Sequence, residues 1–261
     1  MSDAAPLLME KDGSIGWLIF NRPEKRNAVG IETWQLMPDY VKDLAADDAI
    51  RVVILRGAGE KAFVAGADIS QFKDRRRNME DEAEYRRIGA RGREALNALT
   101  KPLLAMIHGY CVGGGVSIAI GCDIRIASDD ARFGIPAAKM GLGYRASSMK
   151  NLVDIVGAAY AREIMITARQ FTAAEAKEMG LVNKVVAVSE LEKTVAEYTQ
   201  TISGNAPLTM RAAKRIIREV IRNDYDAAKC KAWAKECFDS EDYKEGRKAF
   251  MEKRKPAFKG R

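Results

Sequence analysis

Two glycine-rich segments hold the residues of this sequence that are best suited to chemistry. The first reads Phe63-Val-Ala-Gly-Ala-Asp-Ile69, and the second reads His108-Gly-Tyr-Cys-Val-Gly-Gly-Gly-Val-Ser117. Small residues let a ligand approach the backbone closely, and the first turn of a helix offers N–H groups without a partner in the helix. The two segments are therefore predicted to supply a pair of backbone donors to a carbonyl that becomes an enolate. The alternative is that each glycine cluster serves tight packing only.

Alternating strands and helices are predicted to position these segments. The first segment follows an apolar strand at residues 51–55, and the second follows another at 103–107 and runs into a helix. Further strands are predicted at 7–11 and 15–20, paired around Asp12-Gly13-Ser14, and at 124–127 and 132–134, with helices at 31–45 and 80–99. Strands that alternate with helices indicate an α/β fold with parallel pairing.

The C-terminal part of the sequence is predicted to be helical, because the strand pattern ends after about residue 190. Thr172-Ala-Ala-Glu175 and Ser189-Glu-Leu-Glu192 have the capping-box pattern, and Pro207 lies in the first turn of a later helix. We therefore divide the chain into a core of residues 1–195, which carries the site, and a helical region of residues 196–261, which we expect to serve oligomerisation.

The amino-acid composition indicates a globular protein without a metal site or a membrane span. The 261 residues are 47% hydrophobic and 30% charged, as in ordinary globular proteins. The four cysteines form no C-x-x-C pair, and with His108 as the single histidine we expect no metal site. Three consecutive glycines interrupt the apolar stretch at 103–119, so we expect no membrane span. Residues 1–10 lack a basic segment followed by an apolar stretch, so we expect no secretory signal and a cytoplasmic protein. The net charge of +7 would suit either nucleic acid or the phosphates of a nucleotide cofactor.

Motifs along nearly the whole chain follow one another in an order that is specific for one superfamily. They are Asn21-Arg-Pro-Glu-Lys-Arg-Asn-Ala28, Ala65-Gly-Ala-Asp-Ile69, Gly109-Tyr-Cys-Val-Gly-Gly-Gly115, Cys122-Asp-Ile-Arg-Ile-Ala127, Phe171-Thr-Ala-Ala-Glu-Ala176, Met179-Gly-Leu-Val-Asn183 and Phe250-Met-Glu-Lys-Arg-Lys-Pro256. In these motifs the sequence resembles the crotonase, or enoyl-CoA hydratase/isomerase, superfamily. The resemblance implies a crotonase-type spiral of β-β-α units and a helical C-terminal trimerisation region, in a homotrimer or a dimer of trimers.

The resemblance also implies which residues meet the substrate, a coenzyme A (CoA) thioester. The backbone N–H groups of Ala67 and Gly114 would form an oxyanion hole. The positions that match the family's CoA-binding residues are Lys25, Arg26, Ala28, Ala65, Asp68 and Ile69, and Phe250 and Lys253 would reach the CoA of a neighbouring subunit. CoA would be part of the substrate, and no permanently bound cofactor is expected.

The sequence departs from the hydratases of the superfamily at two positions. Those enzymes use two glutamates, one in the helix after the triple glycine and one after the next strand, where this chain has Ser117 and Ala137. One carboxylate activates water while the other delivers the α-proton. The usual hydratase mechanism therefore lacks both of its carboxylates in this chain.

Three functions stay open. The first is an enzyme of the enoyl-CoA hydratase/isomerase type that works through a thioester enolate. The second is decarboxylation of a malonyl-type CoA thioester, in which loss of CO2 itself generates the enolate. Tyr144 resembles the tyrosine of the superfamily's methylmalonyl-CoA decarboxylases, and Arg145 would pair with a substrate carboxylate, but those decarboxylases have a histidine at the position of Ala67. The third is a non-catalytic protein that binds acyl-CoA or RNA.

Overall fold

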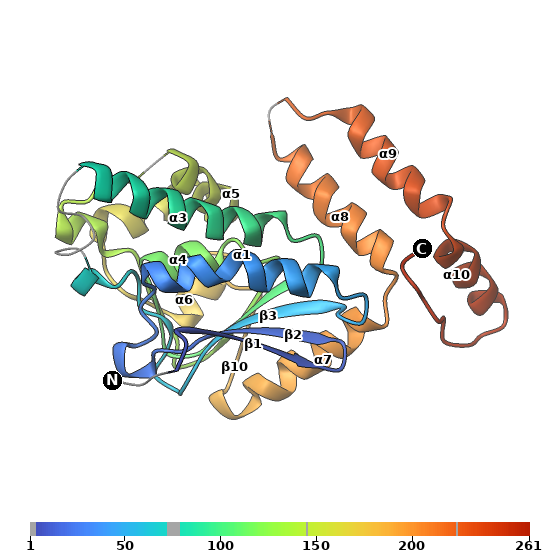
Figure 1. Ribbon diagram of the computed structural model, residues 1–261, viewed down its shortest axis with the longest axis horizontal. Coiled ribbons are helices and arrows are strands. Elements are labelled where there is room, and N and C mark those ends of the chain that lie inside the picture. The colour runs from blue at the N-terminus through green and yellow to red at the C-terminus, as the bar shows by residue number, and fades with distance from the viewer. Residues whose placement is uncertain (1–3, 72–78, 145, 223) are drawn as a thin grey trace.

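The computed structural model describes residues 4–71, 79–144, 146–222 and 224–261 (Figure 1). In this part of the chain the strands form two sheets. The larger sheet contains, in spatial order, β1 (Leu7–Asp12), β2 (Ile15–Phe20), β3 (Val52–Gly57), β5 (Leu103–Ile107), β7 (Ile124–Ser128) and β10 (Lys184–Val186). The smaller sheet contains β4 (Ala62–Val64), β6 (Tyr110–Val112), β8 (Arg132–Gly134) and β9 (Phe171–Thr172). Strands β1 and β2 form the predicted antiparallel hairpin, whereas β3, β5 and β7 pair in parallel.

Helices connect the two sheets in a repeating order. One unit is β3, β4 and α3 (Met79–Ala98), the next is β5, β6 and α4 (Gly114–Ala119), and another is β7, β8 and α5 (Ala146–Thr167). The chain thus winds as a spiral of β-β-α units, and the predicted α/β class is confirmed. The other helices around the sheets are α1 (Ile31–Ala46), α6 (Ala173–Glu178) and α7 (Leu191–Ser203). No helix in the described ranges combines the length and the apolar character that a membrane crossing requires.

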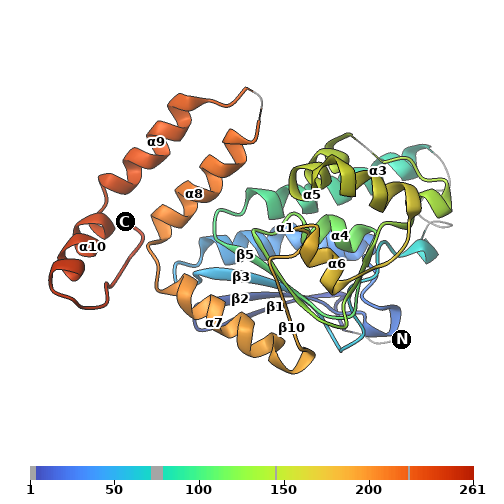
Figure 2. The same cartoon turned by 180° about the vertical axis from the view of Figure 1, so that it is seen from behind.

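The larger sheet is covered on both faces, which explains why its central strands are apolar throughout. Because side chains alternate along a strand, Val53 and Leu55 of β3 enter one apolar cluster, while Val52 and Ile54 enter another that includes α7. Figures 1 and 2 show α1 and α3 on one side of the sheet and α7 on the other. The division that we predicted between residues 195 and 196 falls inside α7, whose buried Ile202 still packs in the second cluster.

The last part of the chain is helical, as predicted, and projects from the core as an arm (Figures 1 and 2). An ion pair of 2.7 Å between Lys214 Nζ and Asp123 Oδ2 and a hydrogen bond of 2.8 Å from Lys214 Nζ to the Lys101 carbonyl attach the arm to the core. Large apolar side chains of the arm face solvent, with Phe250 84% and Met251 82% exposed. The helices of the arm are α8 (Pro207–Val220), α9 (Ala227–Phe238) and α10 (Glu241–Met251).

The two predicted capping boxes have different outcomes. At the start of α6, Thr172 Oγ1 accepts a 3.2 Å hydrogen bond from Glu175 N, and Glu175 Oε2 accepts one of 2.7 Å from Thr172 N. This capping box is confirmed. The prediction at Ser189 is wrong, because a 3-10 turn at Val188–Glu190 precedes α7 and no side chain caps the helix that begins at Leu191.

Candidate active site

The two glycine-rich segments meet at one end of the smaller sheet. Strand β4 leads into residues 65–69, and β6 leads into Gly113 and the first turn of α4. Because β4 and β6 are parallel neighbours, their carboxyl ends lie side by side. A Cβ atom built on Gly114 would lie 3.7 Å from the nitrogen of Ala67. The structure thus brings together the two backbone groups that the sequence nominates as donors.

The direction of the Ala67 N–H is set by a hydrogen bond on the other side of its peptide group. The N–H of Val29 donates to the Gly66 carbonyl at 2.8 Å, and the N–H of Asp68 donates to the Val29 carbonyl at 2.9 Å. In a trans peptide the C=O and the following N–H point in opposite directions. Holding the Gly66 carbonyl toward Val29 therefore turns the Ala67 N–H away from Val29, and leaves it free of the bridge that joins the two segments.

The Gly114 N–H is free for a different reason. Gly114 is the first residue of α4, so its N–H has no acceptor within the helix and carries the partial positive charge of the helix start. Among the residues that the structure describes, no carbonyl accepts a hydrogen bond from either Ala67 N or Gly114 N. Two unpartnered donors that lie close together suit an oxygen on which negative charge develops, as in an enolate or a tetrahedral intermediate.

Glycine is required at two positions that build this pair. Gly66 adopts a φ of 110°, a backbone conformation that side chains disfavour. At Gly115 a Cβ atom would lie 2.1 Å from the Val64 carbonyl oxygen, so only glycine lets α4 approach β4 this closely. Tight packing, one of the two interpretations drawn from the sequence, therefore applies to Gly115. Ligand access stays a prediction for Gly114, where a Cβ atom would meet nothing closer than 3.7 Å.

Ser117 and Ala137 lie close to the donor pair. Ser117 follows Gly114 by three residues on α4, which places both on one face of the helix, and its side chain is half-buried. Ala137 is buried in the 3-10 helix Pro136–Met140. That helix adjoins the donors, because the N–H of Gly113 donates to the Gly134 carbonyl at 2.8 Å. At these two positions the chain therefore carries a hydroxyl and a methyl group.

Tyr144 belongs to the loop that follows this 3-10 helix. The N–H of Leu142 donates to the Ala137 carbonyl at 3.0 Å, which folds the loop back on the turn. The Tyr144 side chain is half-buried against the main apolar cluster, and burial raises the pKa of its phenol above the ordinary value. The phenol therefore stays protonated at neutral pH. Arg145, the other residue predicted for this loop, lies outside the described residues.

The sequence and the fold both match proteins of one family. Residues 10–261 match the family model described as enoyl-CoA hydratase/isomerase. The chain belongs to this family. It is 39% identical over 262 residues to a short-chain-enoyl-CoA hydratase of Clostridium acetobutylicum, with 98% of each chain covered. It is 35% identical over 258 residues to a crotonyl-CoA hydratase of Syntrophomonas wolfei, with 97% of each chain covered. A crystal structure of an enoyl-CoA hydratase/carnithine racemase from Magnetospirillum magneticum matches with a TM-score of 0.92 at 33% identity, over 99% of this chain and 97% of that one.

Several residues that we predicted to contact CoA lie close to the Ala67 donor along the chain or through hydrogen bonds. Ala65 donates its N–H to the Arg26 carbonyl at 3.0 Å, and Ile69, which is 63% exposed, begins the 3-10 helix Ile69–Gln71. The half-buried Ala28 lies directly before Val29 and so beside the bridge to Gly66. Lys25 and Asp68 form an ion pair of 3.3 Å with each other. The Asp68 carboxylate is therefore paired with a cation of the protein itself.

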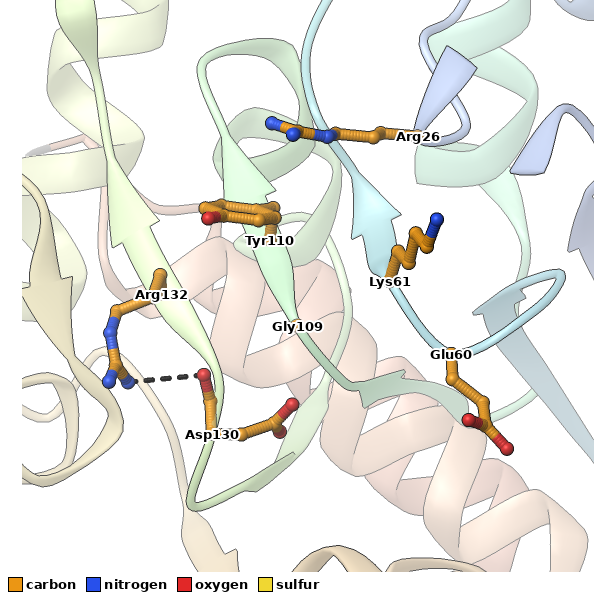
Figure 3. A pocket seen from close by; sticks show the side chains of 7 residues that line it. All are labelled: Arg26, Glu60, Lys61, Gly109, Tyr110, Asp130 and Arg132. Carbon is orange, nitrogen blue, oxygen red and sulfur yellow. Dashed lines mark hydrogen bonds between the residues drawn. The ribbon is translucent and has the colours of Figure 1, made fainter. Parts of the chain in front are cut away.

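The Arg26 side chain is directed away from the donors. Figure 3 shows it extended over the ring of Tyr110, and its guanidinium carbon lies 4.9 Å from the ring centroid. Tyr110 is the first residue of β6, whereas Gly114 follows the end of this strand. The cavity in which Arg26 lies has a volume of about 320 Å³ and is also lined by Glu60, Lys61, Gly109, Asp130 and Arg132. The interaction of Arg26 with CoA stays a prediction.

Phe250 and Lys253 lie on or just after α10, and both views place α10 at the far side of the arm from α4 (Figures 1 and 2). One chain therefore does not bring these two residues to its own donor pair. This placement leaves our prediction of contacts to the CoA of a neighbouring subunit as a prediction.

Sequence reasoning missed the part that Val29 and Arg22 play beside the donors. Val29 makes both backbone hydrogen bonds of the bridge, and Arg22 Nη1 donates to the Asp68 carboxylate at 2.7 Å. Within the motif at residues 21–28 the sequence suggested roles only for Lys25, Arg26 and Ala28, as contacts to CoA. An apolar residue directly after that motif gives no signal that its backbone pairs with residues 66–68, almost 40 positions later.

The histidine and the buried cysteines take no part in this site. Burial lowers the pKa of His108, whose Nε2 is buried without a hydrogen-bond partner among the described residues. Burial raises the pKa of the thiols of Cys111 and Cys122, the latter to about 12, so neither is a ready nucleophile. No three His, Cys, Asp or Glu side chains in the described ranges are grouped so that they could hold a metal ion.

Proposed function

We propose that this member of the enoyl-CoA hydratase/isomerase family binds a CoA thioester and stabilises its enolate between the N–H groups of Ala67 and Gly114. The proposal is carried by one observation, namely that these two unpartnered N–H groups lie side by side at the ends of β4 and β6. CoA is part of the substrate in this proposal. The chain needs no resident cofactor for the step, because the backbone itself polarises the thioester carbonyl.

The proposed rate enhancement comes from the negative charge that develops on the thioester oxygen during the reaction. When a bond at the α-carbon breaks or a nucleophile adds at the β-carbon, an electron pair moves onto this oxygen, and both N–H groups then bind it more strongly than they bind the neutral carbonyl. One donor of such a pair is typically worth ~10²–10³ in rate. The protons must be handled by water or by a hydroxyl group, for which Ser117 and Tyr144 are the candidates.

Decarboxylation of a malonyl-type CoA thioester is the second candidate reaction. It is favoured by the protonated phenol of Tyr144, and by Ser117 and Ala137, neither of which carries a carboxylate that could serve as a general base. In this reaction the bond between the α-carbon and the carboxylate breaks, CO2 leaves, and the electron pair forms the enolate. A proton from the Tyr144 hydroxyl or from water then adds to the α-carbon. Hydration would instead require a base to take a proton from the attacking water.

We also propose that the protein is a homo-oligomer, a trimer or a dimer of trimers. Phe250 and Met251 on the arm support this, because they are adjacent and largely exposed, and contiguous exposed apolar surface marks sites of protein–protein contact. Light scattering coupled to size exclusion measures the mass directly. A monomer at micromolar concentration would contradict the proposal.

Mass spectrometry of a mixed thioester panel tests the reaction. Short and medium enoyl-CoAs, malonyl-type CoAs and saturated acyl-CoAs are incubated with the protein, and with a Gly114→Ala variant as the control. Addition of water to an enoyl-CoA supports the hydratase reaction, and loss of CO2 from a malonyl-type CoA supports the decarboxylase. If every thioester survives while one of them binds, the protein is a non-catalytic acyl-CoA binder. Salt-dependent RNA binding without any thioester binding would favour the RNA-binding alternative.

A further inference from the structure

The carboxylate of Asp68 is buried next to the Ala67 donor and is fully engaged. Its side chain is 5% exposed. Oδ1 accepts hydrogen bonds from Ser70 N at 3.0 Å and from Ser70 Oγ at 2.5 Å. Oδ2 accepts from Arg22 Nη1 at 2.7 Å and from Lys25 Nζ at 3.3 Å. With both oxygens occupied by protein groups, the carboxylate is poorly placed to contact CoA or a thioester directly.

Arg22 links this carboxylate to the segment that aims the donor. The same Nη1 atom that contacts Asp68 lies 3.4 Å from the Ala28 carbonyl oxygen, to which it also donates. The next residue, Val29, binds the Gly66 carbonyl and the Asp68 N–H. The guanidinium and the carboxylate thus hold together two chain segments at the residues where the backbone bridge is made. The same two segments are also joined by the ion pair of Lys25 with Asp68 and by the hydrogen bond from Ala65 N to the Arg26 carbonyl. Among the described side chains, however, only that of Arg22 hydrogen-bonds to both the carboxylate and the residue directly before Val29.

We propose that Asp68 is a positioning residue, which acts through Arg22 to hold the Val29 bridge and so keeps the Ala67 N–H directed at the thioester oxygen. The inference rests on the proposed function. It replaces the role that the sequence suggested for Asp68, a direct contact to CoA. Positioning matters at this point because a shift of ~1 Å in a catalytic group can cost ~10² in rate.

Asp68→Asn is the test variant, because the amide oxygen still accepts from Ser70 while the amide N–H₂ group faces the cations of Arg22 and Lys25. We expect kcat to fall ~10–10²-fold with little change in KM, since the donor is misdirected but the CoA-binding surface remains. Glu190→Gln is the matched control. It removes an exposed carboxylate that pairs with Lys193 on the other side of the larger sheet. Both kcat and KM should stay as in the wild type.

A spectroscopic readout separates positioning from a merely structural role. A saturated acyl-CoA with a ¹³C-labelled thioester carbonyl is bound to the intact protein, and its carbonyl resonance is compared with that of the free thioester. Hydrogen bonds from the two donors polarise the carbonyl and move the resonance downfield. We expect Asp68→Asn to lose part of this shift at saturating ligand. Arg22→Gln should lose a similar part, and the double variant should lose no more than either single variant.

The outcomes distinguish the failure of this inference from the failure of the proposed function. If the wild type itself shows no downfield shift, the two N–H groups are not an oxyanion hole and the function proposal fails. If the wild type shows the shift and folded Asp68→Asn keeps both the shift and kcat, Asp68 does not position the donor, and the function proposal stands. A rise in KM alone would return Asp68 to the role of a CoA contact. Should Asp68→Asn not fold, Arg22→Gln gives the same comparison.

Discussion

Gly114 and Gly115 are neighbours, yet replacing each by alanine should have opposite consequences. At Gly114 the new methyl group meets nothing closer than 3.7 Å, its φ is not positive, and the residue lies at the start of a helix. Stability should therefore change by less than about 1 kcal/mol. The methyl group lies 3.7 Å from the Ala67 nitrogen, and we expect it to occupy space that the thioester oxygen needs. We expect kcat/KM to fall ~10²–10³-fold, which corresponds to about 3–4 kcal/mol of transition-state stabilisation.

At Gly115 the methyl group would lie 2.1 Å from the Val64 carbonyl oxygen and 3.0 Å from its carbon, both in the backbone of β4. Relief of this clash requires α4 and β4 to separate, at a cost of about 3 kcal/mol or more. For a chain of this size such a loss lowers Tm by roughly 6–12 °C. Differential scanning calorimetry and the turnover of whichever thioester the panel identifies check both variants. A stable Gly114→Ala variant with full activity would refute the assignment of the two N–H groups as the site of carbonyl binding.

Three further predictions follow from the structure. Tyr144→Phe should lower decarboxylation of a malonyl-type CoA ~10²-fold or more with Tm unchanged, and an unaltered rate would show that water supplies the proton. Asp123→Asn leaves the buried Lys214 ammonium without its carboxylate, so Tm should fall by roughly 4–8 °C and protease cleavage between α7 and α8 should speed up. Burial opposes ionisation of Asp68, but hydrogen bonds from Ser70, Arg22 and Lys25 outweigh it and lower the pKa from 3.8 to about 2. The associated stability, about 2 kcal/mol, is present above pH ~4 and lost as the pH falls toward 2, so acid unfolding of Asp68→Asn should lack this component.

The fold was largely predictable because the strands, and the points at which helices begin, leave local patterns in the sequence. Continuous apolar runs such as residues 52–55 and 103–107 indicate strands that are buried on both faces, and Pro207 correctly indicated the start of a helix. A capping box was predicted correctly only where the side chain of the first residue hydrogen-bonds to the backbone of the helix that follows. Thr172 caps α6, whereas Ser189 is taken up by a 3-10 turn that its neighbours form, and no pattern in the sequence distinguishes the two cases.

The candidate site was predictable in its backbone and much less in its side chains. Glycine spacing and family motifs nominated Ala67 and Gly114, and the structure places them together. Side-chain direction depends on tertiary contacts that motifs do not carry. Arg26 has the right charge for a phosphate but stacks on Tyr110, and Asp68 has its carboxylate occupied by cations from residues 22–25. The pairing of Val29 with residues 66–68 is a long-range register, which the sequence of either segment alone does not specify.

The bridge between Val29 and Gly66 has a consequence for how the chemistry of such a site can be altered. Because both donors are main-chain groups, exchange of the side chain at residue 67 does not remove a donor. Proton transfer in the reactions that we propose would instead use water or a side-chain hydroxyl, for which Ser117 and Tyr144 are the candidates. Carbonyl activation would therefore depend on the backbone, whereas proton transfer would depend on water or on side chains that can be exchanged without changing the backbone. A lineage that keeps the bridge can exchange one reaction for another through a few substitutions, and an engineer who starts from this chain has the same freedom.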